Sequence, residues 1–180
     1  MTTMATVLLI DDDASLRRVT EYNLKDDGYA VITASDGREG LERFRAERVD
    51  LVLSDVRMPE LDGMDLLPQL KAMQPDLPVI MLTAHGTIAA AVEAMQLGAF
   101  DYLTKPFTRD QLRASVRKAL EVGRLKSENR QLRQMVTERF SFASMIAGSR
   151  VMRDVTDTTA RVAQSDTTVL LLGESGTGKE

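Results

Sequence analysis

The stretch Leu51-Val52-Leu53-Ser54-Asp55 is a short apolar run that ends on a hydroxyl and a carboxylate. Such a run is typical of a buried parallel strand, and parallel strands bind ligands at their carboxyl ends. Three more segments place acidic, hydroxyl or basic residues after an apolar run: Ile10-Asp11-Asp12-Asp13, Met81-Leu82-Thr83-Ala84 and Leu103-Thr104-Lys105-Pro106. The four strand ends would share one small cleft, whose carboxylates, hydroxyl and ammonium suit a phosphoryl group and its metal ion.

Short apolar runs alternate with helical periodicity from Val7 to about Leu120. The predicted strands are Val7–Ile10, Tyr29–Thr33, Leu51–Ser54, Val79–Leu82 and Phe100–Leu103. The predicted helices are Ala14–Asp26, Gly37–Arg45, Gly63–Met73, Thr87–Leu97 and one that begins at Arg109. Gly28 and Gly98 follow two of these helices, where a left-handed C-terminal cap favours glycine. Consecutive βα units of this kind predict an α/β domain, a parallel sheet with helices on both faces.

The composition is that of an ordinary globular protein. Its 180 residues suffice for one full domain and a remainder, and the formal net charge of −4 argues against bulk attraction to nucleic acid or an anionic membrane. The absence of cysteine excludes disulfides and thiolate zinc sites. The sequence shows no signal peptide and no apolar run of membrane-spanning length, so we expect a cytoplasmic protein without membrane contact.

The fifth helix is predicted to continue beyond the domain. Apolar or seam-compatible residues recur at a 3-4-3-4 spacing: Val122, Leu125, Asn129, Leu132 and Val136. This spacing is that of a two-stranded coiled coil, in which an Asn in the seam fixes the register. Residues 122–140 are therefore predicted to form a helical linker that joins two chains as a homodimer. An amphipathic helix packed on its own domain is the alternative, because only about two heptads are present.

Asp11, Asp12 and Asp55 would crowd together at the edge of the sheet. Three adjacent carboxylates repel one another unless a cation is present, and Mg²⁺ suits them because it binds carboxylates, waters and phosphate oxygens. Lys105 would pair with a phosphate oxygen, and the Thr83 hydroxyl would donate a hydrogen bond to another. Asp55 is then the nucleophile, and an acyl phosphate is the product.

Each of these residues also has an ordinary structural interpretation. Asp12 or Asp13 could cap the helix that begins near Ala14. Thr83 could begin the loop before the next helix, and Lys105 could be a solvated charge. One shared site accounts for all of them at four consecutive strand ends, whereas the ordinary interpretations need a separate coincidence at each.

Residues 5–121 resemble the receiver domain of two-component response regulators over its whole length. The motifs that carry the resemblance are Asp11-Asp12, Ser54-Asp55-Val56-Arg57-Met58-Pro59 with Asp62-Gly63 following, Thr83-Ala84 and Lys105-Pro106-Phe107. The resemblance implies a flavodoxin-like, doubly wound, five-stranded parallel sheet of strand order 2-1-3-4-5. It also implies a cis peptide bond between Lys105 and Pro106.

The same resemblance implies the roles of the acidic residues. Asp55 would receive its phosphoryl group from a sensor histidine kinase. Mg²⁺ would be held by Asp12, Asp55 and the backbone carbonyl of Arg57, while Asp11 acts largely through water.

A switching role for Tyr102 is implied as well. Once Thr83 turns toward the phosphate, the aromatic ring of Tyr102 would rotate inward, which is a two-state packing change. A half-buried strand residue without a switching role is the alternative for Tyr102.

After Phe140 the pattern predicts a loop over Ser141–Arg150, a helix over Val151–Ala163 and a buried strand over Val169–Leu172. The strand leads into Gly173-Glu174-Ser175-Gly176-Thr177-Gly178-Lys179-Glu180, which fits the start of a phosphate-binding (Walker A) loop. Such a loop cradles phosphates with backbone N–H groups and reaches them with its lysine. The general pattern ends in Ser or Thr, where this chain has Glu180.

Residues 142–180 resemble the opening of the AAA+ ATPase domain of sigma-54-dependent transcriptional activators of the NtrC type. The phosphate loop of that family reads as it does here, and Ala163-Gln164-Ser165-Asp166 also fits. We expect 141–180 to be an N-terminal fragment of that domain, poorly packed by itself and without ATP hydrolysis. ATP, sigma-54 RNA polymerase and DNA would be partners only of a complete ATPase domain and its C-terminal regions.

The sequence thus predicts a response regulator that relays a kinase signal to a transcription-activating output, and not an enzyme. A phosphatase of the haloacid-dehalogenase type would place a second Asp two residues after the nucleophile, where this chain has Arg57. A working P-loop ATPase would need the rest of its domain. A stand-alone receiver that acts by protein contact, without a transcription output, is the alternative that stays open.

Overall fold

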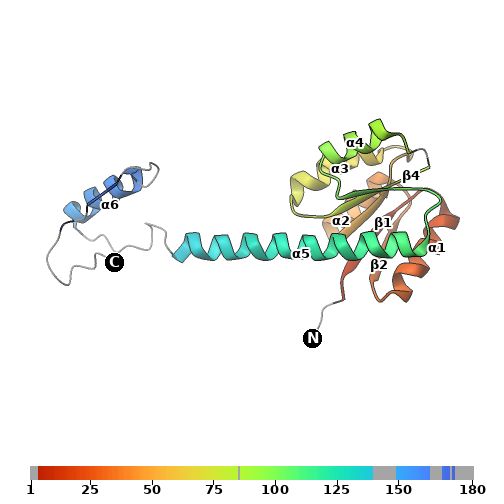
Figure 1. Cartoon of the computed structure of the whole chain (residues 1–180), viewed down its shortest axis with the longest axis horizontal. Coiled ribbons are helices and arrows are strands. Elements are labelled where there is room, and N and C mark those ends of the chain that lie inside the picture. Colours follow the sequence, from red (N-terminus) through yellow and green to blue (C-terminus); the bar gives the residue numbers. More distant parts are fainter. Residues whose placement is uncertain (1–3, 85, 140–148, 163–167, 171, 173–180) are drawn as a thin grey trace. The chain divides into compact units, whose positions relative to one another are not determined.

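The computed structural model describes residues 4–84, 86–139, 149–162, 168–170 and 172, and strands and helices alternate in it as far as residue 139 (Figure 1). For residues 134–139 and 160 the description covers the backbone. The strands are β1 (Thr6–Ile10), β2 (Ala30–Ala34), β3 (Leu51–Asp55), β4 (Val79–Thr83) and β5 (Asp101–Thr104). The helices are α1 (Ala14–Asp26), α2 (Gly37–Ala46), α3 (Gly63–Met73), α4 (Ile88–Gln96), α5 (Arg109–Arg139) and α6 (Arg150–Val162). The chain consists of two compact units, residues 1–129 and residues 130–180.

The strands form one parallel sheet of order β2-β1-β3-β4-β5, which confirms the predicted architecture and strand order. The register aligns the strand ends at one edge of the sheet. Ile10 pairs with Ser54 across β1 and β3, and Thr83 pairs with Thr104 across β4 and β5. The polar residues that follow these strands therefore gather at the same edge, where parallel sheets bind ligands.

Both faces of the sheet are covered by helices. In β1, Val7 and Leu9 point into one core and Leu8 and Ile10 into the other, and all four are fully buried. Helices α1 and α5 cover the Val7 face, while α2, α3 and α4 cover the Leu8 face. Because both faces are dry, the central strands are continuously apolar instead of alternating with polar residues.

Caps fix where the helices begin and end. Asp36, Asp62 and Thr87 cap α2, α3 and α4 by accepting a hydrogen bond from a backbone N–H of the first turn. Helices α1 and α4 end before glycines with positive φ, Gly28 at 88° and Gly98 at 97°. Glycine populates this left-handed region without the steric cost of a Cβ, and the predicted C-terminal caps are confirmed.

Helix α5 is 31 residues long and continues past the sheet. Ala119 is buried, and a Cβ added at Gly123 would lie 3.0 Å from the Cδ of Pro78. From residue 124 to residue 133 every side chain is exposed, including Leu125 at 50% and Leu132 at 62%. The part of the linker from residue 124 to residue 129 is therefore not packed on the sheet domain. None of the described helices is both long and apolar enough to cross a membrane.

The tail departs from the prediction in two places. Helix α6 begins at Arg150, which the sequence pattern places in a loop. Residues 168–170 and 172 form no strand, so the predicted buried strand Val169–Leu172 is wrong for these residues, and Leu170 is 80% exposed. A strand needs a neighbour for its backbone hydrogen bonds, and no strand in the described part of the chain pairs with this segment.

Two predictions for the tail lie outside the described residues. They concern the segment Ala163-Gln164-Ser165-Asp166 and the phosphate loop Gly173–Glu180. The nucleotide-binding role of that loop therefore stays a prediction from sequence.

Candidate functional site

Three carboxylates gather where β1 and β3 end. Ligand oxygens of Asp11, Asp12 and Asp55 all lie within 4.8 Å of one another. Asp11 and Asp55 are buried, with 1% and 7% of their surface exposed, whereas Asp12 is exposed. The pairing of Ile10 with Ser54 explains the meeting, because it sets the next residue of each chain segment side by side. The structure thus brings together the acidic residues that the sequence predicts to meet.

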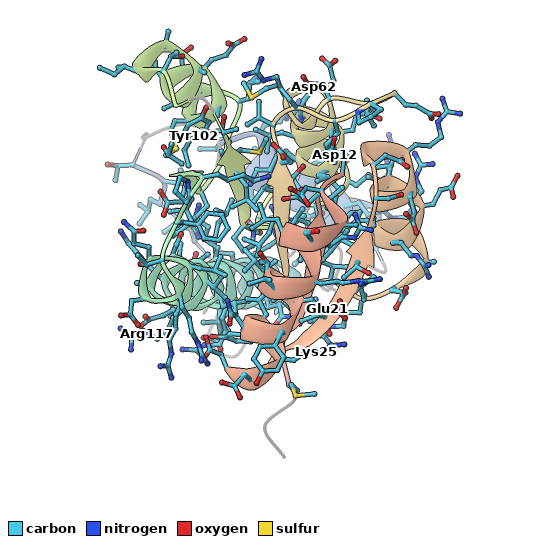
Figure 2. All side chains as sticks on the ribbon, turned by 90° about the vertical axis from the view of Figure 1, so that its right-hand side faces the viewer. Asp12, Glu21, Lys25, Asp62, Tyr102 and Arg117 are labelled. Carbon is cyan, nitrogen blue, oxygen red and sulfur yellow. The ribbon has the colours of Figure 1, made fainter. Side chains whose placement is uncertain are left out.

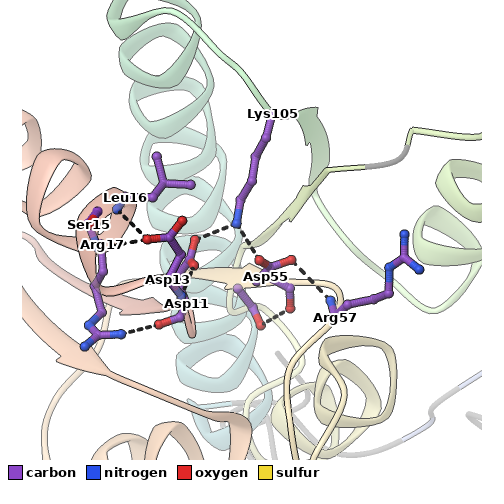
Figure 3. A network of polar contacts seen from close by, with 9 residues as sticks. Asp11, Asp13, Ser15, Leu16, Arg17, Asp55, Arg57 and Lys105 are labelled. Atoms are coloured by element: carbon purple, nitrogen blue, oxygen red, sulfur yellow. Dashed lines mark hydrogen bonds and ion pairs between the residues drawn. The ribbon is translucent and has the colours of Figure 1, made fainter.

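Lys105 lies among these carboxylates, although it is 94 residues from Asp11 and 50 residues from Asp55 in sequence (Figure 3). Its Nζ donates to Asp11 Oδ2 at 2.7 Å and also to Asp55 Oδ2. Only 13% of its side chain is exposed, so the interpretation of Lys105 as a solvated charge is wrong. Its backbone N–H donates to the Thr83 carbonyl at 2.6 Å, and its peptide bond to Pro106 is cis, as predicted.

Burial and ion pairing act against each other at this site. The pKa of Asp11 is raised above its ordinary 3.8, because burial of the carboxyl outweighs the hydrogen bond and charge of Lys105. Burial alone would lower the pKa of Lys105, but the hydrogen bonds and charges of Asp11 and Asp55 together raise it above 10.5. Lys105 is therefore a fixed positive charge at neutral pH.

Asp11 and Arg17 hold the turn after β1. Asp11 Oδ1 accepts from the backbone N–H of Asp13 at 3.0 Å, and Arg17 Nη1 donates to the Asp11 carbonyl at 2.5 Å (Figure 3). Asp13 caps α1, and its bonds from the first N–H groups of the helix lower the pKa of its carboxyl. Of the two candidate caps, Asp13 is the cap and Asp12 belongs to the acidic cluster, at the opposite end of α1 from Lys25 (Figure 2).

Arg17 was not predicted as part of the site. Its position one helical turn after Asp13 places its side chain back over the start of α1, which is the one signal in the sequence. An Arg four residues after an N-cap residue is common on helices, so this spacing does not by itself predict a contact of Arg17 with the Asp11 carbonyl.

A glycine holds the loop after β3 close to Asp55. The Gly63 N–H donates to the Val56 carbonyl at 2.9 Å, and a Cβ added at Gly63 would lie 2.1 Å from the Asp55 carbonyl oxygen. No side chain fits in that space. The Arg57 N–H donates to Asp55 Oδ1 at 3.2 Å, which places Arg57 beside the carboxylate. A metal-binding role for the Arg57 carbonyl stays a prediction.

Thr83 lies on β4, and Tyr102 lies on the neighbouring strand β5. Thr83 is the last residue of β4 and is 2% exposed, so it does not begin a loop. Tyr102 is half-buried on β5 and packs against the core that α2, α3 and α4 cover (Figure 2). Its hydroxyl is buried and has no hydrogen-bond partner within the described part of the chain.

The donor set suits a hard divalent cation. Three carboxylates converge within reach of one ion, and three negative charges face the single positive charge of Lys105. Mg²⁺ prefers oxygen ligands and is commonly bound through one or two carboxylates and a phosphate. The cluster could therefore hold a metal ion.

Two family models match the chain. Residues 7–117 match the response regulator receiver domain, and residues 145–180 match the sigma-54 interaction domain. The first match contains all the residues of the candidate site described above.

Curated relatives match nearly the whole chain. It is 43% identical over 176 residues to the transcriptional regulatory protein GlrR of Escherichia coli (strain K12), which covers 98% of this chain and 37% of GlrR. It is 39% identical over 180 residues to the C4-dicarboxylate transport transcriptional regulatory protein DctD of Rhizobium meliloti (strain 1021), which covers 100% of this chain and 39% of DctD. The chain thus spans 37% and 39% of the length of these two relatives.

Solved structures share the fold. A response regulator receiver domain protein from Clostridium thermocellum superimposes with a TM-score of 0.65 at 39% identity, over 68% of this chain and 98% of that one. NtrX from Brucella abortus, in complex with ADP, superimposes with a TM-score of 0.67 at 32% identity, over 89% of this chain and 34% of NtrX.

Proposed function

The chain belongs to the response regulator receiver domain family, and on that basis we propose that Asp55 accepts a phosphoryl group from a sensor histidine kinase. The observation that carries the proposal is the placement of Asp55, at the end of a buried strand, beside Lys105 and two more carboxylates. A carboxylate held in one orientation by a cation is positioned to act as a nucleophile.

In the transfer, an Asp55 carboxylate oxygen attacks the phosphorus of a phosphohistidine. A P–O bond forms, the P–N bond breaks, and its electron pair stays with the imidazole of the kinase. Lys105 then exchanges its bond to Asp55 Oδ2 for one to a phosphoryl oxygen, and the Thr83 hydroxyl donates to another. The product is an acyl phosphate on Asp55, which stores the signal.

Asp12, Asp55 and the Arg57 carbonyl would hold Mg²⁺, with Asp11 acting largely through water. Bound Mg²⁺ supplies positive charge that offsets the charge on the phosphoryl oxygens during transfer. Asp12 is exposed, so a phosphodonor that arrives from solvent can reach the acidic cluster at this residue.

Thr83 and Tyr102 would convert phosphorylation into a packing change. An unpaired buried hydroxyl costs about 1–3 kcal/mol, and the Tyr102 hydroxyl is unpaired within the described part of the chain. A rotation that gives this hydroxyl a partner would recover that free energy, so Thr83 needs to bias the ring only slightly.

The output would be activation of transcription, which is proposed for a longer protein because the chain spans 37% and 39% of the length of the two transcriptional regulatory relatives. The match of residues 145–180 to the sigma-54 interaction domain supports this output over a stand-alone receiver. ATP would bind at the phosphate loop of a complete ATPase domain, and sigma-54 RNA polymerase and DNA would be partners of the longer protein. The 180 residues themselves would not hydrolyse ATP, and the cytoplasm is the proposed location.

The domain division that follows is a receiver at 5–121, a linker at 122–140 and an ATPase fragment at 141–180. The linker would join two chains as a homodimer. Leu125 and Leu132 are half or more exposed in a single chain, and pairing of two such helices would remove this apolar surface from water.

Labelling with a small phosphodonor such as acetyl phosphate tests the acceptor. The 180-residue chain should take up one phosphoryl group in the presence of Mg²⁺ and none in EDTA. Asp55→Asn should abolish labelling, and Asp110→Asn, which removes an exposed carboxylate of the first turn of α5, should leave it unchanged. Persistent labelling of Asp55→Asn would sink the assignment.

A further inference from the structure

We propose that Arg17 is a positioning residue for the metal site, which sets the direction of the Asp12 carboxylate, and with it the affinity for Mg²⁺, by holding the Asp11 carbonyl. Arg17 lies on α1, six residues after Asp11, and its Nη1 donates to that carbonyl at 2.5 Å (Figure 3). This role rests on the Mg²⁺ site proposed above. It extends that site to a side chain outside the acidic cluster.

The bond from Arg17 reaches the peptide unit that joins Asp11 and Asp12. The Asp11 carbonyl and the Asp12 N–H belong to one planar group, so they can only turn together. Rotation of this plane changes ψ of Asp11 and φ of Asp12, and it carries the Asp12 side chain to a new direction. A hydrogen bond to the carbonyl oxygen therefore restricts where the Asp12 carboxylate points.

Other contacts hold Asp11 and Asp13 but leave the peptide unit between Asp11 and Asp12 to Arg17. The N–H of Asp11 donates to a carbonyl of β2 at 3.2 Å, and the Asp13 N–H donates to Asp11 Oδ1 at 3.0 Å. Lys105 donates to the other carboxylate oxygen of Asp11 at 2.7 Å. Asp12 is exposed, and within the described part of the chain its carboxylate has no hydrogen bond or ion pair of its own. The direction of this carboxylate therefore depends on its backbone.

The start of α1 directs Arg17 toward the carbonyl. The backbone N–H of Arg17 donates to the Asp13 carbonyl at 2.8 Å, and side chains on a helix lean toward its N-terminus. Arg17 is half-buried and Asp11 is 1% exposed, so water is a poor replacement for the guanidinium at this carbonyl. Since a buried carbonyl needs a partner, loss of Arg17 would let the peptide unit turn toward another donor.

The charge of Arg17 and its hydrogen bond have opposite effects on metal binding. Removal of a positive charge near three carboxylates would by itself strengthen Mg²⁺ binding, whereas loss of the orientation of Asp12 would weaken it. Residues that orient metal ligands commonly contribute about ten- to a hundredfold in metal affinity. Arg17 is half-buried and Asp12 is exposed, so solvent screens the charge, and we expect the loss of orientation to dominate.

Titration of the full 180-residue chain with Mg²⁺ in a calorimeter separates the two effects. Arg17→Met should raise the Kd at least about tenfold. Arg17→Lys should also raise it, because the ammonium keeps the charge but ends one bond short of Nη1. If charge alone mattered, Arg17→Lys would bind like wild type and Arg17→Met would bind more tightly. Arg18→Met is the matched control, because it removes a neighbouring exposed charge of α1 and should not raise the Kd.

Labelling with acetyl phosphate over a range of Mg²⁺ concentrations gives a second readout. Arg17→Met should need at least about tenfold more Mg²⁺ for its half-maximal rate and should approach the wild-type rate at saturation, because Asp55 and Lys105 are unchanged. A rate that stays low at saturating Mg²⁺, with an unchanged Kd, would contradict the positioning role.

Urea unfolding in EDTA shows whether each variant is folded, and Arg17→Lys carries the same test if Arg17→Met does not fold. A wild-type or lower Kd in a folded Arg17→Met or Arg17→Lys chain would overturn the inference. A wild-type chain that binds no Mg²⁺ would instead refute the metal site itself, so the two failures are distinguishable.

Discussion

Replacing Asp12 by asparagine should stabilise the protein in the absence of Mg²⁺ and remove the stabilisation that Mg²⁺ provides. Asp12 is the exposed member of the acidic cluster, with its ligand oxygen within 4.8 Å of those of Asp11 and Asp55. Lys105 pairs with both buried carboxylates and offsets one of their two charges. Asp12 therefore faces an excess of one negative charge.

The size of the effect follows from that distance. Two unit charges 4.8 Å apart repel by about 0.9 kcal/mol at a dielectric constant of 80 and about 3.5 kcal/mol at 20. Because Asp12 is exposed, the lower value applies, and Asp12→Asn should raise the free energy of unfolding by about 1 kcal/mol in EDTA. Wild type should gain about 2.7 kcal/mol when Mg²⁺ is at a hundred times its Kd. The variant should gain little, because an amide is a weaker ligand, so the order of stabilities reverses.

Urea unfolding in EDTA and in saturating Mg²⁺ measures both quantities, the stability without the metal ion and the stability gained from it. Glu42→Gln is the control, because it removes an exposed carboxylate on α2 outside the acidic cluster and should change neither arm. If Asp12→Asn lowers stability in EDTA, or gains as much from Mg²⁺ as wild type, the carboxylates do not form one metal site.

Three more outcomes test the structure around the site by urea unfolding. Lys105→Met should cost about 3–5 kcal/mol because it leaves buried carboxylates without their cation, and Mg²⁺ should restore more stability to it than to wild type. Gly63→Ala should lower the free energy of unfolding more than Gly28→Ala, because it places a Cβ 2.1 Å from a backbone oxygen. Gly28→Ala meets only the steric cost of its positive φ, about 1 kcal/mol. Equal losses of stability in the two variants would refute this. The pKa of the Asp36 carboxyl is lowered from 3.8, because this N-cap residue accepts a hydrogen bond from a backbone N–H of α2. The ionised carboxylate therefore stabilises the folded protein above pH 3.8, and this stabilisation is lost as the pH falls through the lower pKa of the folded state. Asp36→Asn should keep the N-cap and make the free energy of unfolding depend less on pH below 3.8. If the variant loses as much stability at acid pH as wild type, Asp36 does not contribute in this way.

The fold was predictable because its signals are local. Apolar runs end at Asp55 and Thr83, and the C-terminal caps of two helices contain Gly28 and Gly98. These local signals predict the alternation of strands and helices. Parallel order then brings the polar strand ends to one edge, which is why the sequence predicts that Asp55 and Lys105 lie in one site.

The parts that sequence reasoning missed depend on neighbours. The contact of Arg17 with the Asp11 carbonyl is made to the backbone, which no residue pattern encodes. The apolar run Val169–Leu172 resembles a strand, but a strand exists only where another strand accepts its hydrogen bonds. The lack of a hydrogen-bond partner for the Tyr102 hydroxyl among the described residues is likewise a consequence of packing and not of spacing.

Chemical trapping of the phosphorylated residue identifies which aspartate accepts the phosphoryl group. Borohydride reduces an acyl phosphate to an alcohol, so a phosphorylated aspartate becomes homoserine and is located by peptide mass spectrometry. After incubation with a small phosphodonor and Mg²⁺, we expect homoserine at position 55 and at no other aspartate, and none at position 55 in EDTA. Conversion of a different residue, or unmodified Asp55 in a chain that has taken up phosphate, would contradict it.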